Sequence, residues 1–351
     1  MLEQILQSFG LDESAYHIRF FGSGLINHTF KVSGSENEFI LQQINSDVFK
    51  SPKVIVNNLT LLQEYLNISH PHYLFVGPIK AVNGEFLVLS ASGKYYRMFP
   101  FITGSQTINV ISNEKEAYEA AKQFGRFTSL LKEFDPSHLQ YTLTDFHNLE
   151  LRFGQFETAE KKASVERSKE AAVEIKEVYK HNNILQTYRT ILDKKEIPIR
   201  VIHHDTKISN VLFDRHQNGL CVIDLDTVMP GYFFSDVGDM MRTYLSPANE
   251  EETDLSKIYV REIIFNAICK GYLSQMGGIL TAREKEYFVF SGELMIYMQA
   301  IRFLTDYLND DIYYGSKYPG HNLNRAKNQF KLLDEYIKHE GKFKKLIEAI
   351  N

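Results

Sequence analysis

The stretch VIHHDTKISNVLFD, residues 201–214, constrains the fold more than any other part of this chain. It brings two histidines, an aspartate, a lysine and an asparagine to the start of an apolar run. Burying such polar groups without partners costs free energy, so they must either satisfy one another or take part in chemistry. The pattern therefore predicts a polar site at the mouth of a buried strand.

A second apolar segment, LCVIDLD, follows and is joined to the first by RHQNG, which contains the strong Asn-Gly turn signal. A five-residue loop would place Asn210 roughly opposite Asp224, whereas a two-residue Asn-Gly turn would shift Asn210 by about three residues, roughly 10 Å. In both registers Asp205, Asn210, Asp224 and Asp226 come to one end of the hairpin. Clustered carboxylates raise one another's pKa values unless a cation lies among them. We therefore expect Mg²⁺, which prefers hard oxygen ligands.

The spacing His203-x-Asp205-x₄-Asn210, followed by Asp224 after the next strand, is that of a kinase catalytic loop and its metal-binding aspartate. In protein kinases the second aspartate stands in a DFG triplet, whereas here it stands in VIDLD. The motif thus indicates phosphoryl transfer but points away from protein kinases.

The distribution of apolar residues predicts two lobes. Alternation in the first hundred residues indicates strands, and a helical repeat follows over 52–66. The expected strands cover residues 16–21, 28–33, 38–44, 84–90 and 94–102. Later periodicity predicts helices over 113–134, 158–192, 255–275, 282–308 and 322–350. We expect an α+β, bilobal, protein-kinase-like fold. Residues 1–101 would form a small antiparallel nucleotide-binding lobe with one helix, and residues 102–351 a larger, mainly helical catalytic and substrate-binding lobe.

Composition and charge limit the kinds of partner and the cellular location that we expect. The net charge of −5 argues against nucleic acid as a partner, since phosphate binding favours a basic face. Cys221 and Cys269 lie in apolar contexts, which favours two buried thiols over a disulfide. The first residues lack the basic start of a signal peptide, and no apolar run reaches the roughly 18 residues that span a bilayer. We expect a cytoplasmic protein without a membrane partner.

Six segments together resemble the aminoglycoside phosphotransferase/choline kinase family over nearly the whole chain. They are GSGLINHTF, FILQQIN, HHDTKISNVLFD, VIDLDTVMPG, SDVGDMMR and QAIRFLTDYLNDDIYY. The resemblance is strongest to those members that phosphorylate N-acetylhexosamines. It implies transfer from ATP, with Mg²⁺, to the anomeric hydroxyl of an N-acetylhexosamine such as GlcNAc or GalNAc, giving the sugar 1-phosphate.

Other acceptors on the same fold stay open, namely an aminoglycoside, choline or ethanolamine, or a homoserine-type amine. Cationic acceptors favour acidic or aromatic pockets, and YLNDDIYY contains two aspartates. A nucleotide-sensing module without activity is disfavoured, because Asp205, Asn210 and Asp224 are all present.

Roles in the reaction follow from the need to align a hydroxyl and neutralise phosphate charge. We expect Asp205 to accept or orient the hydroxyl proton, while His203 braces the loop. Lys207 is expected to reach the γ-phosphate, although a surface lysine is the alternative. The expected metal ligands are Asn210, Asp224 and Asp226, the last of which could instead support the other two.

The segment FGSGLINHTF is expected to cover the ATP phosphates, because its glycines let the backbone approach closely. RMFPFI, residues 97–102, is the expected hinge whose backbone contacts adenine, since Pro100 argues against an interior strand. The predicted ATP-binding residues are Gly22, Ser23, Gly24, Asn27, Thr29, Gln42, Met98, Phe99 and Phe101. FILQQIN lacks the lysine that usually meets the nucleotide phosphates, so Mg²⁺, Lys207 or backbone amides must replace it.

Residues 293–318 supply polar and aromatic side chains suited to a sugar. Arg302 and Asp306 are four apart and could instead pair on a helix surface. The predicted substrate-binding residues are His28, His204, Asp205, Arg302, Tyr313 and Tyr314. In SDVGDMMR, Asp236 is expected to support the catalytic loop, and Asp239 and Arg242 to form an ion pair.

Overall fold

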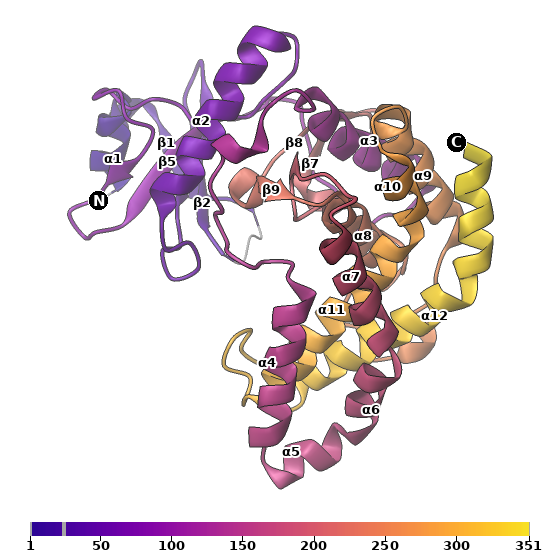
Figure 1. Ribbon diagram of the computed structural model, residues 1–351. Helices are drawn as coiled ribbons and strands as arrows, with labels where there is room; N and C mark the ends of the chain where they lie inside the picture. Colours follow the sequence, from indigo (N-terminus) through magenta and orange to yellow (C-terminus); the bar gives the residue numbers. More distant parts are fainter. Residues whose placement is uncertain (1, 23–25, 351) are drawn as a thin grey trace.

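The computed structural model describes residues 2–22 and 26–350, which form a small sheet-containing part and a larger helical part (Figure 1). The sheet is antiparallel, in the order β1-β2-β3-β5-β4. Its strands are β1 (His17–Phe20), β2 (His28–Ser33), β3 (Glu38–Gln43), β4 (Val88–Leu89) and β5 (Tyr95–Pro100). The predicted strands are all present, although β4 is only two residues long.

The small part contains two helices rather than the single one predicted. The short α1 (Leu2–Ser8) buries Ile5 and Leu6 in a core shared with Val32, Leu41 and Met98 of the sheet. The long α2 (Pro52–Ser69) begins with proline in its first turn, where the missing N–H costs no helical hydrogen bond. Its apolar face belongs to the main core of the helical part, so α2 joins the two lobes.

The sheet also corrects the argument made from Pro100. Strand β5 is interior, between β3 and β4, and Pro100 is its last residue. The proline is tolerated because β4 pairs only with Tyr95 and Tyr96, so the end of β5 has no neighbour on that side.

The larger part is built from ten helices and packs around α11, which is buried along most of its length. The helices are α3 (Glu114–Leu130), α4 (Leu149–Lys162), α5 (Val165–Glu170), α6 (Ala172–Lys180), α7 (Asn182–Lys194), α8 (Phe233–Tyr244), α9 (Glu262–Met276), α10 (Ala282–Glu286), α11 (Phe288–Leu308) and α12 (His321–Ile350). The predicted helical region 158–192 is divided among four of these, because caps such as Ser164 interrupt it. The bilobal fold is thus the predicted one.

Two strand pairs lie within the helical part. The pair β7 (Val211–Phe213) and β8 (Gly219–Val222) is the predicted hairpin, and its register places Val211 opposite Val222. This register differs by one residue from the register predicted for a five-residue loop. The alternative prediction, a two-residue Asn-Gly turn, was wrong. The pair β6 (Arg200–Ile202) and β9 (Met229–Gly231) was not predicted. The polar segment 203–210 begins directly after β6, and β9 pairs with β6 after the Asp224 loop.

The connection between the lobes is tied to the hairpin. Gln106 and Phe213 exchange two backbone hydrogen bonds, of 2.9 and 2.8 Å. On the other side of the boundary, the buried Asn58 of α2 donates to the carbonyls of Gln140 and Val228. The contacts of Asn58 cross the boundary that we propose at residues 101/102, and those of Gln106 fix the start of the larger lobe.

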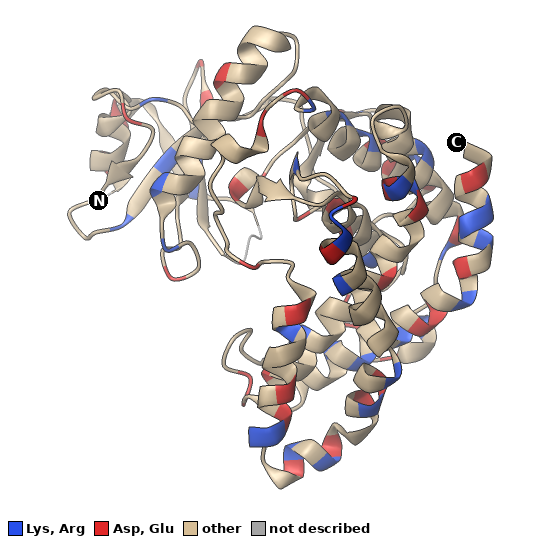
Figure 2. Ribbon diagram, in the orientation of Figure 1, with Lys and Arg blue, Asp and Glu red and all other residues tan. Residues whose placement is uncertain are grey.

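Acidic and basic residues alternate along the outer helices such as α5 and α12 (Figure 2). Both cysteines are free and buried, as predicted. Among the described residues, no helix combines the length and apolar character needed to cross a bilayer.

Candidate active site

The catalytic segment that follows β6 is held by two carboxylates of α8. Asp236 accepts hydrogen bonds from the amides of His203 (3.0 Å) and His204 (2.7 Å). Asp239 accepts one from the amide of Thr206 (2.9 Å) and pairs with Arg242 at 2.8 Å. Burial raises the pKa of Asp236 to about 6, although the two amides oppose this shift. The predicted support role of Asp236 and the predicted Asp239–Arg242 pair are confirmed.

His203 is fully buried, and both of its ring nitrogens contact the backbone of the site. Its Nε2 lies 2.9 Å from the carbonyl of Ile223, and its Nδ1 lies 3.3 Å from the amide of Asp205. Because a carbonyl only accepts and an amide only donates, the imidazole carries its proton on Nε2. His203 therefore links the catalytic segment to the strand that precedes Asp224.

Asp205 lies at the centre of a small charged group. Its carboxylate is 3.1 Å from the Lys207 ammonium and receives a hydrogen bond of 3.2 Å from the Asn210 amide. Burial alone would raise the pKa of Asp205, but Lys207 and then His203 lower it below its usual value. Asp205 is thus ionised at neutral pH. The side-chain amide nitrogen of Asn210 donates to the carbonyl and the carboxylate of Asp205. The side-chain oxygen of Asn210 therefore remains available to bind a ligand.

Asp224 lies where β8 has ended and adopts a left-handed conformation, with φ of 58°. Burial is the main cause that raises the pKa of Asp224, and the neighbouring carboxylates of Asp226 and Asp205 add to it. Together they bring this pKa to about 7. Its side chain is nevertheless exposed, so solvent moderates this shift. Several carboxylates with an amide oxygen are a donor set that suits a hard divalent cation.

Asp226, by contrast, is buried and already engaged. Arg97 of β5 lies 2.5 Å from one of its oxygens, and the side-chain amide of Asn27 donates to the other at 2.8 Å. Arg97 also donates twice to Gln42 of β3, at 3.2 and 2.9 Å. Sequence reasoning missed Arg97, because its neighbours in RMFPFI suggested only a hinge.

The structure describes most of the predicted ATP-binding residues, but not all of them. Gly22 has φ of 83°, a conformation that favours glycine, and Ser23 and Gly24 lie outside the described residues. Thr29 and Gln42 are joined by a hydrogen bond of 3.2 Å. In the hinge segment the Met98 carbonyl accepts from Ile79, and the Phe101 amide donates to Glu38. Phe99 stands opposite Ile40 of β3 in the sheet.

The predicted acceptor residues come from separate segments. His204 has φ of 67°, and burial lowers its pKa to about 3, so its ring is neutral. That ring lies 5.6 Å from the ring of His147, and Phe146 lies beneath the Arg302 guanidinium at 5.7 Å. Phe146 and His147 were missed by sequence reasoning, since nothing in TDFHNL marks them. His28 begins β2, and its side chain is exposed.

Arg302 and Asp306 do not pair, which overturns the surface-pair alternative. Arg302 donates to Gln299, whose amide in turn donates to the Tyr314 hydroxyl. Asp306 instead accepts from the backbone amides of Tyr313 (2.7 Å) and Tyr314 (2.9 Å). The aromatic pair is therefore fixed through its backbone by α11.

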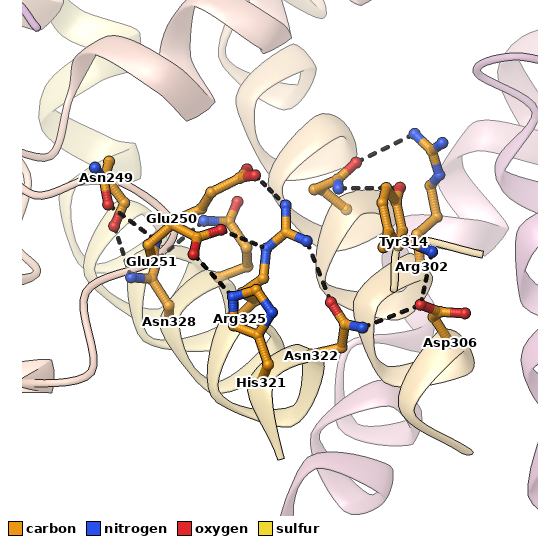
Figure 3. A network of polar contacts seen from close by, with 12 residues as sticks. Asn249, Glu250, Glu251, Arg302, Asp306, Tyr314, His321, Asn322, Arg325 and Asn328 are labelled. Carbon is orange, nitrogen blue, oxygen red and sulfur yellow. Dashed lines mark hydrogen bonds and ion pairs between the residues drawn. The ribbon is translucent and has the colours of Figure 1, made fainter. Parts of the chain in front are cut away.

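A polar network joins the loop after α11, which carries Tyr313 and Tyr314, to α12 and to Glu250 (Figure 3). The buried Asn322 of α12 donates to Asp306 (3.0 Å) and to the carbonyl of Gly315 (2.9 Å), and it accepts from Arg325. Arg325 pairs with Glu250, which lies 2.9 Å from Arg242. Since Arg242 pairs with Asp239, the network reaches the catalytic segment.

A second cluster of potential metal ligands lies away from this site, on α6 and α12. The Nε2 of His181 is 3.4 Å from Glu177 and 3.5 Å from Asp334. The Lys180 ammonium lies 2.7 Å from Glu177 and 3.3 Å from Asp334. Because a cation already neutralises both carboxylates, an ion-pair network accounts for the cluster.

Solved structures of similar fold include kinases of small molecules. A microcompartment-associated aminopropanol kinase aligns with a TM-score of 0.66 at 17% identity, over 97% of this chain and 98% of that one. A spectinomycin phosphotransferase bound to ADP and spectinomycin gives 0.60 at 12%, over 99% and 97%. Choline kinase from Cryptosporidium parvum Iowa II gives 0.60 at 16%, over 96% of each chain.

A family model described as phosphotransferase enzyme family matches residues 17–257. The match contains the whole five-stranded sheet, residues 203–210 and the Asp224 loop, and it confirms the resemblance to the phosphotransferase family. Because it spans more than half of the chain, this protein belongs to the phosphotransferase enzyme family.

Proposed function

We propose that this protein transfers the γ-phosphoryl group of ATP to the anomeric hydroxyl of an N-acetylhexosamine. Membership of the phosphotransferase family supports the reaction class. The choice of a neutral sugar rests on one observation, the charge of the acceptor side of Asp205. The anomeric position comes from the sequence resemblance.

Several arginines act by charge on one residue of the proposed acceptor side. His147, which lies against His204, has its pKa lowered well below the usual value by burial, then by His204, Arg302, Arg242 and Arg152. A site where several guanidinium groups act on one ring disfavours a cationic acceptor such as choline or an aminoglycoside. It suits hydroxyl and amide oxygens, to which arginine donates.

The nearby acids are engaged by other groups of the protein. The two aspartates of YLNDDIYY that left a cationic acceptor open, Asp310 and Asp311, pair with Arg167 at 3.1 and 2.9 Å. Asp306 caps two backbone amides, as described above. Arg302, by contrast, has a neutral amide and aromatic rings as its neighbours.

Asp205 is placed to act on the acceptor. We infer that its ionised carboxylate accepts the proton of the sugar hydroxyl as the hydroxyl oxygen bonds to the γ-phosphorus and the bond to ADP breaks. Lys207, whose ammonium lies 3.1 Å from this carboxylate, can stabilise negative charge on the transferring group. His203 and Asp236 hold the segment in position.

Asn210 and Asp224 would hold the divalent cation, for which Mg²⁺ is our proposal. A bound cation supplies charge neutralisation to the phosphate oxygens and relieves repulsion among the carboxylates. Asp226 is better placed as a support, because Arg97 and Asn27 occupy both of its oxygens. We propose that Gly22, Ser23, Gly24, Asn27 and Thr29 lie over the nucleotide.

A screen of ATP consumption tests the acceptor. The panel is GlcNAc, GalNAc, glucose, galactose, choline, ethanolamine, homoserine and kanamycin, each at a concentration series that yields kcat/KM. We expect an N-acetylhexosamine to give the highest value. A higher value for choline, ethanolamine or kanamycin would overturn the charge argument and establish the alternative of a cationic acceptor.

The product then tests the position of transfer. Coupling between phosphorus and the anomeric proton in the NMR spectrum is expected, whereas coupling to the C6 protons would refute the 1-kinase proposal. Asp205→Asn serves as the matched protein control, since it should consume no acceptor-dependent ATP while keeping the fold.

A further inference from the structure

The pair of charges that organises a kinase nucleotide site is absent from its usual places. In protein kinases, a lysine of the third strand pairs with a glutamate of the neighbouring helix. Here β3 reads EFILQQ, with no lysine, and the only acidic residue of α2 is the exposed Glu64. Neither partner of the usual pair is available.

A different pair lies between the lobes. Arg97 is 1% exposed and stands opposite Gln42 in the register of β3 and β5. One of its nitrogens lies 2.5 Å from Asp226, two residues after the proposed cation ligand Asp224. Removing two charges from water is unfavourable unless the pair is well placed, so such a burial needs a purpose or a compensation.

The surroundings of the pair fix its geometry. Gln42 accepts from two nitrogens of Arg97, and the Phe99 ring lies 4.9 Å from the guanidinium carbon. Asn27 donates to the second oxygen of Asp226 and accepts from the amide of Asn45. Asn27, just before β2, and Arg97 of β5 therefore both contact the Asp226 carboxylate, and Gln42 of β3 holds Arg97.

We propose that Arg97 is a positioning residue that replaces the missing lysine, and that its pair with Asp226 holds the Asp224 loop against the nucleotide-binding lobe. This inference rests on the proposed function, because it assigns the pair to a nucleotide site. The pair differs from the usual one in crossing between the lobes. It therefore aligns the proposed cation ligands with the nucleotide-binding lobe before the nucleotide arrives.

Nucleotide affinity tests this role. Binding of the β,γ-imido analogue of ATP with Mg²⁺ is measured by calorimetry for the intact protein and for Arg97→Met, Arg97→Lys and Asp226→Asn. We expect Arg97→Met to weaken binding by at least about tenfold, because it leaves a buried carboxylate without its cation. Arg97→Lys should keep part of the affinity, since it retains charge but not the two-nitrogen geometry. The KM for the acceptor should stay unchanged.

A double variant distinguishes positioning from general destabilisation. In Arg97→Met/Asp226→Leu no charge is left unpaired, so the stability lost by Arg97→Met should largely return while the nucleotide affinity stays low. Hydrogen exchange of residues 222–228, measured without nucleotide, should be faster in both variants than in the intact protein. If affinity returns together with stability, or if exchange does not change, the pair has only a structural role.

Arg200→Met is the matched control. Arg200 pairs with the buried Glu284 at 2.7 Å, which is another arginine–carboxylate pair, but on β6 and α10. It should lower stability and leave the nucleotide affinity of the folded protein unchanged. If the intact protein binds no nucleotide, the proposed function itself fails. If it binds and Arg97→Met binds equally well, only this inference fails.

Discussion

At the scale of single residues, the site shows how a chain keeps polar groups at a buried position. The amides of His203, His204 and Thr206 all donate to carboxylates of α8, and His203 satisfies both of its ring nitrogens. With these groups satisfied, Asp205 is the member of the segment that we propose acts on the acceptor.

Replacing Asp205 tests that assignment. Asp205→Asn removes the proton acceptor and should lower kcat by about 10² to 10⁴, the usual range for loss of general base catalysis. Affinity for the ATP analogue, measured by calorimetry, should change little, because the proposed phosphate and cation contacts come from other residues. Asp135→Asn, in the exposed cap of a distant turn, is the control and should retain full turnover. An unchanged kcat in Asp205→Asn would remove Asp205 from its role.

At the scale of elements, α11 and α12 hold the acceptor-side loop. Asn322 is fully buried and joins Asp306, Asp311 and the Gly315 carbonyl. The loop contains Asp310 and Asp311 with φ of 60°, a conformation that costs free energy in residues other than glycine. Its shape therefore depends on the helices that bind it.

Loosening this loop should affect the acceptor and not the nucleotide. Asn322→Ala removes the side-chain donor to the Gly315 carbonyl and one of the donors to Asp306, so the loop that carries Tyr313 and Tyr314 loses support. We expect the acceptor KM to rise by about tenfold or more, in line with the loss of one to two kcal/mol of hydrogen bonding. Asn324→Ala, on the same helix, removes only a contact of 3.4 Å to Tyr318 and serves as control. Equal acceptor KM values in both variants would contradict the prediction.

The contact of α11 with α12 also carries a pH dependence. Burial raises the pKa of Glu293 to about 7 from an ordinary value of 4.5. A folded pKa above the unfolded one means that Glu293 favours folding fully below pH 4.5 and that this contribution is lost as pH rises to about 7. The free energy of unfolding should therefore fall, relative to Glu293→Gln, by roughly 2 to 3 kcal/mol over this interval.

Urea unfolding at pH 4.5 and pH 8 measures this difference for the intact protein and for Glu293→Gln. The free energy of unfolding of Glu293→Gln should increase relative to that of the intact protein as pH rises. The exposed Glu286→Gln should show no such trend and is the control. A constant difference between Glu293→Gln and the intact protein would show that Glu293 is ionised in the folded state throughout.

At the scale of the whole molecule, the proposed site lies where the lobes meet, so ligands should stabilise the protein as a unit. Asp226 contacts Asn27 and Arg97 of the small lobe, while Asp205 and Asn210 come from the large one. A cation among the carboxylates would relieve their repulsion. Nucleotide and cation should therefore favour the same closed arrangement.

Thermal unfolding tests this coupling. The ATP analogue with Mg²⁺ should stabilise the protein by about 2.7 kcal/mol when the ligand is a hundredfold above its Kd, and by more than the sum of the two added separately. Chelation with EDTA should abolish turnover, and added Mg²⁺ should restore it. Additive shifts of the melting temperature would contradict a shared site, and turnover that survives chelation would exclude a role for the cation.

Much of this arrangement is encoded locally. The spacing from His203 to Asn210 and the loop length up to Asp224 depend on strand and turn preferences over a few residues, so the hairpin and its polar end could be predicted. The division of the chain into a sheet lobe and a helical lobe follows from hydrophobic periodicity in the same way. Helix breaks such as the one at Ser164 were harder, because caps are weak signals within a charged helical pattern.

The sequence by itself determined the reaction motif, the lobe order and the absence of a lysine from β3. Only the tertiary structure decided which groups compensate for that absence, namely Arg97 with Asp226, and Asn27 at a separation of 199 residues. It also decided that Phe146 and His147 lie beside His204, and that the aspartates of the acceptor-side loop are paired. The physical reason is that periodicity and turns are set by neighbours in the chain. The partner of a buried charge is set by which distant strands and helices pack together.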